Sequence, residues 1–93
     1  MYYDDVNYAS KITSLLEENG IKVESFSEAN EFVDAGIELD IPKRRISIQI
    51  CPYISDESFI VDEMIGMGDN VKLKTLGTFT NVGQMMSFIK EEL

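Results

Sequence analysis

Residues 36–51 read GIELDIPKRRISIQIC, and this stretch decides the fold. Apolar residues recur at every second position in two runs: Ile37, Leu39 and Ile41, then Ile46, Ile48 and Ile50. Side chains of a strand point to opposite faces in turn, so each run predicts a strand with one buried and one wet face. Pro42 and Lys43 lie between the runs, where proline sets the backbone angle that a turn needs. The sequence therefore predicts an antiparallel hairpin whose aliphatic side chains form the floor of the core.

The length and composition indicate one globular domain. The chain has 93 residues, and we expect a single domain over residues 1–93. Hydrophobic residues make up 44% of the chain, enough for a modest core without metal or disulfides. No apolar run is long enough to span a membrane, and we expect no signal peptide in the opening MYYDDVNY. The single cysteine, Cys51, fits a reducing compartment, so we expect a cytoplasmic protein.

The charge is strongly acidic and unevenly distributed. Seventeen acidic residues stand against 8 basic ones, which gives a net charge of −9. Residues 17–40 contain many acids and one base, Lys22, whereas residues 43–45 form a small basic island. A field of this sign repels nucleic acid and acidic membranes and attracts basic surfaces. The general alternative is that the acidic surface serves solubility alone.

The first part of the chain predicts one helix and one short strand before the hairpin. Residues 4–19 carry an apolar stripe at helical spacing and end at the stop signal Asn19-Gly20. Residues 21–25 alternate as a short strand does. Residues 27–36 leave two alternatives, a short helix capped by Ser27 or a loop followed by a longer strand. We favour the short helix.

The last part predicts two strands and a helix. Residues 58–65 favour a strand, although a helix over the same residues is the alternative. Residues 66–70 are rich in glycine and polar residues, which indicates a hairpin loop into a strand at residues 71–79. Gly77 interrupts the alternation there and marks a candidate β-bulge. Asn81 is a good helix cap with Gln84 three residues later, and an apolar stripe follows to the C-terminus. The predicted class is α+β, an antiparallel sheet of four to five strands with both terminal helices on one face.

The sequence offers little equipment for catalysis. It contains no histidine, so the usual general base near neutral pH is missing, and Cys51 has no histidine to activate it. Adjacent acids such as Asp62-Glu63 point to opposite faces of a strand and are read as solvated surface. Glu38 and Asp40 share a face and form at most a weak cation site. We expect no enzyme activity, no cofactor and no resident metal.

The acidic region therefore carries the functional prediction, an inhibitor that binds a basic partner protein. Carboxylates spaced along an edge can replace phosphates opposite arginine and lysine. The predicted partner-binding residues lie before and within the hairpin: Glu24, Glu28, Glu31, Asp34, Glu38 and Asp40. In size, charge and fold class the chain resembles small phage-encoded anti-CRISPR and antirestriction DNA mimics, and immunity proteins that neutralise nuclease toxins. That resemblance implies a nucleic-acid-binding enzyme or complex as partner, with no direct binding to nucleic acid or membrane.

The alternative is an assembly or chaperone-like interaction module. Such a module would bind through a sheet edge or through a surface of methionine and phenylalanine. Phe26 and Phe88 lie off the predicted inner faces of their elements, and the Met85-Met86 pair with Met64 and Met67 could make an adaptable contact surface. A homodimer is compatible with this alternative.

Overall fold

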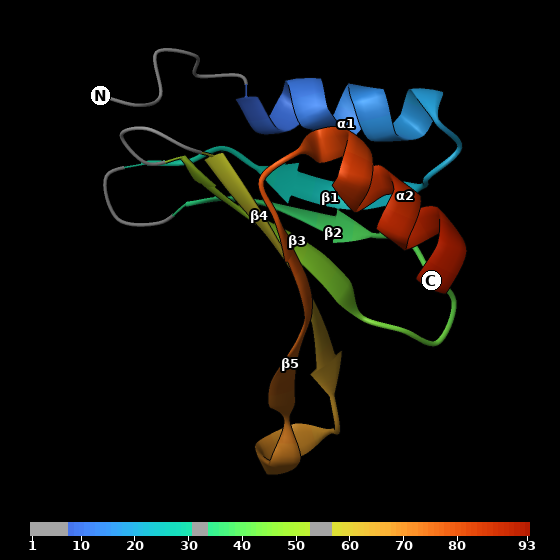
Figure 1. The fold of residues 1–93 in the computed structure, drawn as a ribbon. Coiled ribbons are helices and arrows are strands. Elements are labelled where there is room, and N and C mark those ends of the chain that lie inside the picture. The colour runs from blue at the N-terminus through green and yellow to red at the C-terminus, as the bar shows by residue number, and fades with distance from the viewer. Residues whose placement is uncertain (1–7, 31–33, 53–56) are drawn as a thin grey trace.

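Five antiparallel strands and two α-helices occupy the part of the chain that this computed structural model describes, residues 8–30, 34–52 and 57–93 (Figure 1). In chain order the elements are α1 (Tyr8–Glu18), β1 (Val23–Ser27), β2 (Ala35–Leu39), β3 (Ile46–Pro52), β4 (Glu57–Ile65), the short 3-10 helix η1 (Gly68–Asn70), β5 (Lys72–Phe79) and α2 (Val82–Glu92). The strands pair in the order β1-β2-β3-β4-β5, so each lies beside the next one in the chain. The predicted α+β class and antiparallel sheet are confirmed.

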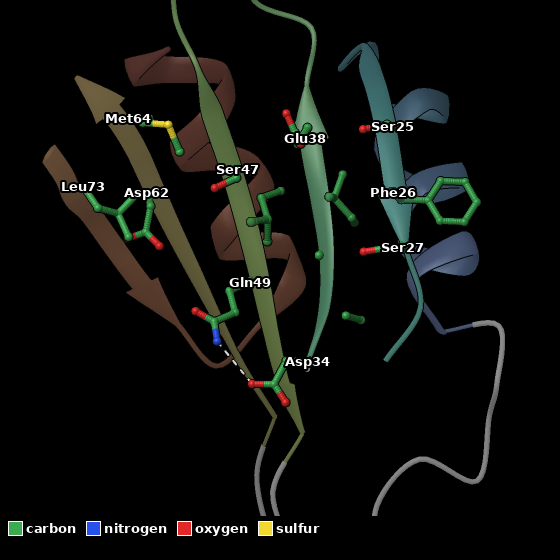
Figure 2. A pocket seen from close by; sticks show the side chains of 14 residues that line it. Ser25, Phe26, Ser27, Asp34, Glu38, Ser47, Gln49, Asp62, Met64 and Leu73 are labelled. Atoms are coloured by element: carbon green, nitrogen blue, oxygen red, sulfur yellow. Dashed lines mark hydrogen bonds between the residues drawn. The ribbon is translucent and has the colours of Figure 1, made fainter. Parts of the chain in front are cut away.

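The core lies between the sheet and the two helices. Ile37, Ile48 and Val61 pair across β2, β3 and β4, and each is at most 1% exposed. Leu16 of α1 and Met85 of α2 belong to the same buried apolar cluster. The alternation of the hairpin thus turns its aliphatic side chains toward both helices, as predicted. The opposite side of the sheet carries no helix among the described residues, and Figure 2 views the sheet from that side with both helices behind it.

A tight turn joins β2 to β3 and shortens the predicted first strand. β2 ends at Leu39, and Ile41 takes part only in an isolated bridge with Arg44, whose N–H donates to the Ile41 carbonyl at 3.2 Å. Pro42 occupies the second position of this turn, and Lys43 follows it with a φ of 65°. Proline followed by a left-handed residue is the pattern of a type II turn. The predicted turn is confirmed, and the extension of the strand through Ile41 is wrong because the turn needs that residue.

The short helix predicted over residues 27–36 is wrong. Ser27 ends β1, and Ala35 and Gly36 already belong to β2, paired with β3. Residues 28–30 and 34 are not helical either, and residues 31–33 lie outside the described part of the chain. Strand pairing on both sides outweighs the local helix signals, because Ala35 is completely buried opposite Ile50.

The β4 and β5 strands form the longest hairpin of the sheet. The strand prediction for residues 58–65 is confirmed, as is the strand that begins near residue 71. Val61 pairs with Gly77 and Asp62 with Thr75, so Leu76 is an extra residue in β5. The β-bulge predicted beside Gly77 is therefore present. The distal part of this hairpin, with η1 at its tip, projects away from the helices (Figure 1).

The two helices have different N-terminal caps. Asn81 caps α2 as predicted, since its side-chain oxygen accepts the Gln84 N–H at 3.0 Å. At α1, the backbone N–H groups of Ala9 and Ser10 donate to the carboxylate of Glu28, at 2.8 and 2.9 Å. The predicted start of this helix near residue 4 lies outside the described part of the chain. Among the described residues, neither helix has the length and apolar content that a membrane span requires.

Candidate functional site

The helix-free face of the sheet carries the candidate site. On β2 and β3, the residues between the buried aliphatic ones point to this side, which exposes Glu38 and Gln49 and leaves Ser47 partly covered. Figure 2 shows these side chains on the side of the sheet opposite the helices. The predicted wet face of the hairpin is confirmed at these positions.

A row of polar residues crosses this face from one edge of the sheet to the other. Each member pairs directly with the next across the five strands, in the order Ser25, Glu38, Ser47, Asp62 and Thr75. Hydroxyl and carboxylate side chains therefore alternate along the row. The backbones of neighbouring strands lie about 4.8 Å apart. Glu38 and Asp62 are two strands apart, so their backbones are separated by about 10 Å. We call these five residues the polar row.

A groove of about 710 Å³ runs over four members of the polar row, Ser25, Glu38, Ser47 and Asp62. The side chains of Met64 and Leu73 on β4 and β5 supply an apolar wall at one end, whereas Phe26 borders the other end on β1 with its ring turned outward past the sheet edge (Figure 2). The ionisable residues that line it are all acidic: Asp34, Glu38 and Asp62. A groove with this lining favours cations and hydrogen-bond donors over anions.

Asp62 differs from the other carboxylates of the groove because it is buried. The residue is only 5% exposed, and its Oδ1 atom has no hydrogen-bond partner among the described residues. The prediction that the Asp62-Glu63 pair is solvated surface is wrong for Asp62. The sequence contains no signal for its burial, which follows from its place between Ser47 and Thr75 on neighbouring strands.

The predicted partner-binding residues do not form one cluster. Asp34 and Glu38 both line the groove, and Asp34 accepts a hydrogen bond from Gln49 at 3.2 Å. Glu28 instead caps α1 and does not project from a helix, which corrects its predicted setting. Glu28 therefore lies apart from Asp34 and Glu38, which the groove brings together.

Of the other three predicted partner-binding residues, two lie apart from the groove and one lies outside the described part of the chain. Glu24 is exposed at the point where β1 shifts register against β2. Asp40 is exposed just beyond β2 and lines a smaller hollow with Glu17 and Lys22. Glu31 lies outside the described part of the chain.

The arrangement suits binding by charge and hydrogen bonds. Across the described ranges, no three acidic or cysteine side chains come together in a way that could hold a metal ion. The serine hydroxyls of the polar row have no histidine beside them, since the sequence has none. The side chain of Cys51 lies outside the described part of the structure.

The basic island of the hairpin turn is partly neutralised within the fold. The Arg44 guanidinium donates to both carboxylate oxygens of Glu63 on β4, at 2.9 Å from Nε and 2.8 Å from Nη2. These hydrogen bonds hold the pKa of Glu63 below its ordinary value, and the nearby positive charges of Arg44 and Lys74 act in the same direction. The pairing ties the β2–β3 turn to β4 on the side of the helices.

The projecting end of the β4–β5 hairpin exposes apolar residues. We call it the hairpin arm and define it by its exposed apolar side chains, Met64, Ile65, Met67, Val71 and Leu73. Phe26, on β1 at the opposite edge of the sheet, is 45% exposed and pairs with the buried Ile37. Phe88 is half-buried and packs against the core, with its ring 5.2 Å from that of Phe79, centroid to centroid, so its predicted position off the inner face of α2 is wrong.

In comparisons with known proteins, no family model matches the sequence, and no match is found among curated proteins or among solved structures.

Proposed function

We propose that this protein is a non-enzymatic acidic inhibitor that occupies a basic, nucleic-acid-binding surface of a partner protein. The observation that carries the proposal is the groove on the helix-free face, whose ionisable lining residues are all carboxylates. A net charge of −9 adds a long-range field of the same sign. The proposal places the protein in the cytoplasm, in line with its single cysteine.

The physical basis is charge complementarity. The partner's arginine and lysine side chains would otherwise contact phosphates, and carboxylates accept the same charge-assisted hydrogen bonds. Each exposed carboxylate alone contributes about 0–1 kcal/mol, but several acting together steer association and raise its rate. Size, charge and fold class support the comparison with anti-CRISPR, antirestriction and toxin-immunity proteins. Of the predicted binding residues, Asp34 and Glu38 have the setting that this role requires.

Capture of partners at two salt concentrations tests the proposal. We expect the tagged protein to retain a nucleic-acid-binding protein at low salt, to release it at high salt, and to lose it to added DNA. The double variant Asp34→Lys/Glu38→Lys should lose this capture. The variant Glu91→Lys/Glu92→Lys makes the same charge change on exposed residues of α2 and should keep most of it. If added DNA leaves the captured protein in place and neither variant weakens capture, the proposal is wrong.

The hairpin arm favours a second candidate function, an assembly or chaperone-like module. Met67 at its tip is 81% exposed and Leu73 is 63% exposed, and exposed apolar patches mark protein interaction sites. Such a partner, or a second copy of the chain, would stay bound at high salt, because apolar contacts are not screened. The variant Met67→Ser/Leu73→Ser should then abolish capture or dimerisation, while the lysine variants of the groove leave it unchanged.

A further inference from the structure

The buried carboxylate of Asp62 is the strongest unexplained feature of the groove. It is 95% covered, it lines the groove, and its Oδ1 has no donor among the described residues. Its cross-strand neighbours, Ser47 and Thr75, belong to the polar row and have hydroxyl groups. A buried acceptor without a partner lowers stability, and an apolar side chain would be more favourable at such a position. The position therefore has the properties of a site that is completed by a ligand.

We propose that Asp62 is the anchor for one arginine side chain of a partner protein. The guanidinium would bind the Asp62 carboxylate, and it reaches the unpartnered Oδ1 once the side chains that cover this atom move aside. The hydroxyl oxygens of Ser47 and Thr75 lie on the neighbouring strands to accept further N–H groups. This inference rests on the proposed function, because that function supplies a basic partner, and it names the residue type that the groove receives.

The chemistry of the groove favours arginine over other cations. Met64 and Leu73 line the same part of the groove as apolar walls. A guanidinium is weakly hydrated and planar, so it enters such surroundings more readily than the strongly hydrated ammonium of lysine. A metal ion fits less well, because the described residues contain no group of three possible metal ligands.

A short peptide tests the site without the partner. We would titrate ¹⁵N-labelled protein with acetyl-Gly-Arg-Gly-amide and follow amide chemical shifts. Saturable shifts are expected at Ser47, Asp62 and Thr75 and at their neighbours on β3, β4 and β5. The same peptide with citrulline, which is neutral and similar in shape, should bind about tenfold more weakly or not at all. Equal binding of the citrulline peptide would overturn the proposal.

Variants at and beside Asp62 sharpen the test. Asp62→Asn keeps the shape and should lose arginine binding by about tenfold or more. Thr75→Lys places a cation of the protein itself opposite Asp62, so it should block the peptide and raise the melting temperature. The control Thr78→Lys makes the same charge change at another exposed position of β5, opposite Ile60, and should leave binding nearly unchanged.

The outcomes separate this inference from the proposed function. In one outcome, the Asp34→Lys/Glu38→Lys variant loses a DNA-sensitive partner, but the wild-type protein shows no arginine-dependent shifts at Asp62. This outcome supports the proposed function and refutes the role of Asp62 as an arginine anchor. Arginine-dependent shifts that vanish in Asp62→Asn support the anchor even if no nucleic-acid-binding partner is captured. If Asp62→Asn unfolds the protein, the comparison of Thr75→Lys with Thr78→Lys decides, and equal binding by these two variants refutes the anchor.

Discussion

The turn between β2 and β3 strains the backbone of Lys43. Lys43 is the non-glycine residue of the described ranges with a positive φ, 65°, a conformation that a side chain with a Cβ disfavours. We expect Lys43→Gly to stabilise the protein by up to about 1 kcal/mol, because relief of this strain exceeds the added freedom of the unfolded chain. Thermal unfolding measures the change, about 4–8 °C per kcal/mol in a domain of this size.

A matched control for this prediction is Gly20→Ala. Gly20 has a φ of 83°, and a Cβ there would meet no atom within 4 Å. The substitution should destabilise by about 1 kcal/mol for conformational reasons alone. An unchanged melting temperature in both variants would contradict the account of the turn.

Ile48 carries the central packing prediction. It is fully buried in β3 between Ile37 and Val61 on the neighbouring strands. Ile48→Asp should abolish cooperative unfolding, because an unpaired charge would lie in the core. Circular dichroism during heating tests this directly. Gln49→Ser on the exposed face is the control and should change stability by less than about 1 kcal/mol, and a cooperative Ile48→Asp variant would refute the register.

Among the contacts between elements, the Glu28 carboxylate links the N-terminus of α1 to the segment after β1 by hydrogen bonds. The carboxylate accepts the N–H groups of Ala9 and Ser10, donors that have no partner within the helix, and its charge interacts favourably with the helix dipole. Glu28→Ala should therefore destabilise the protein by about 1–2 kcal/mol in urea unfolding. Glu24→Ala, at an exposed position of β1, should cost far less. Equal costs would mean that the capping contact contributes nothing.

The Arg44–Glu63 pair predicts a pH dependence of the link between the β2–β3 turn and β4. Because folding lowers the pKa of Glu63, the pair stabilises the protein above the pKa of the unfolded state. This contribution disappears as the pH falls through the lowered pKa of the folded state. Urea unfolding of Glu63→Gln should therefore show a lower stability than wild type at neutral pH and a shrinking difference in acid. A difference that stays constant down to pH values below the carboxylate range would contradict the pairing.

The elements also show what could be predicted from the sequence. The alternation around Ile48 and the stripe of α2 predicted two strands and a helix, because burial on one face imposes those periods. The helix prediction for residues 27–36 is wrong, since local cap signals at Ser27 do not report strand pairing. Asp62 could not be identified as a site residue, because its burial depends on the register of three strands and on the bulge at Leu76.

For the molecule as a whole, the net charge of −9 opposes folding through self-repulsion. The variants Asp34→Lys/Glu38→Lys and Glu91→Lys/Glu92→Lys each replace two acids by two bases, so the net charge becomes −9 + 4 = −5. Both should melt at a higher temperature than wild type at low salt. Raising the salt from about 0.1 to 1 M shortens the Debye length from about 10 to 3 Å, so the difference from wild type should shrink.

The comparison between these two variants tests why the acids lie on the helix-free face. Asp34 and Glu38 line one groove with Asp62, whereas Glu91 and Glu92 follow one another at the exposed end of α2. If local repulsion in the groove is the larger cost, the Asp34→Lys/Glu38→Lys variant should gain more stability at 0.1 M salt and lose capture of the partner. Acids that lower stability and are needed for binding are expected at a functional site. A smaller gain at the groove than at α2 would show that these carboxylates impose no stability cost, and solubility would then suffice to explain the charge.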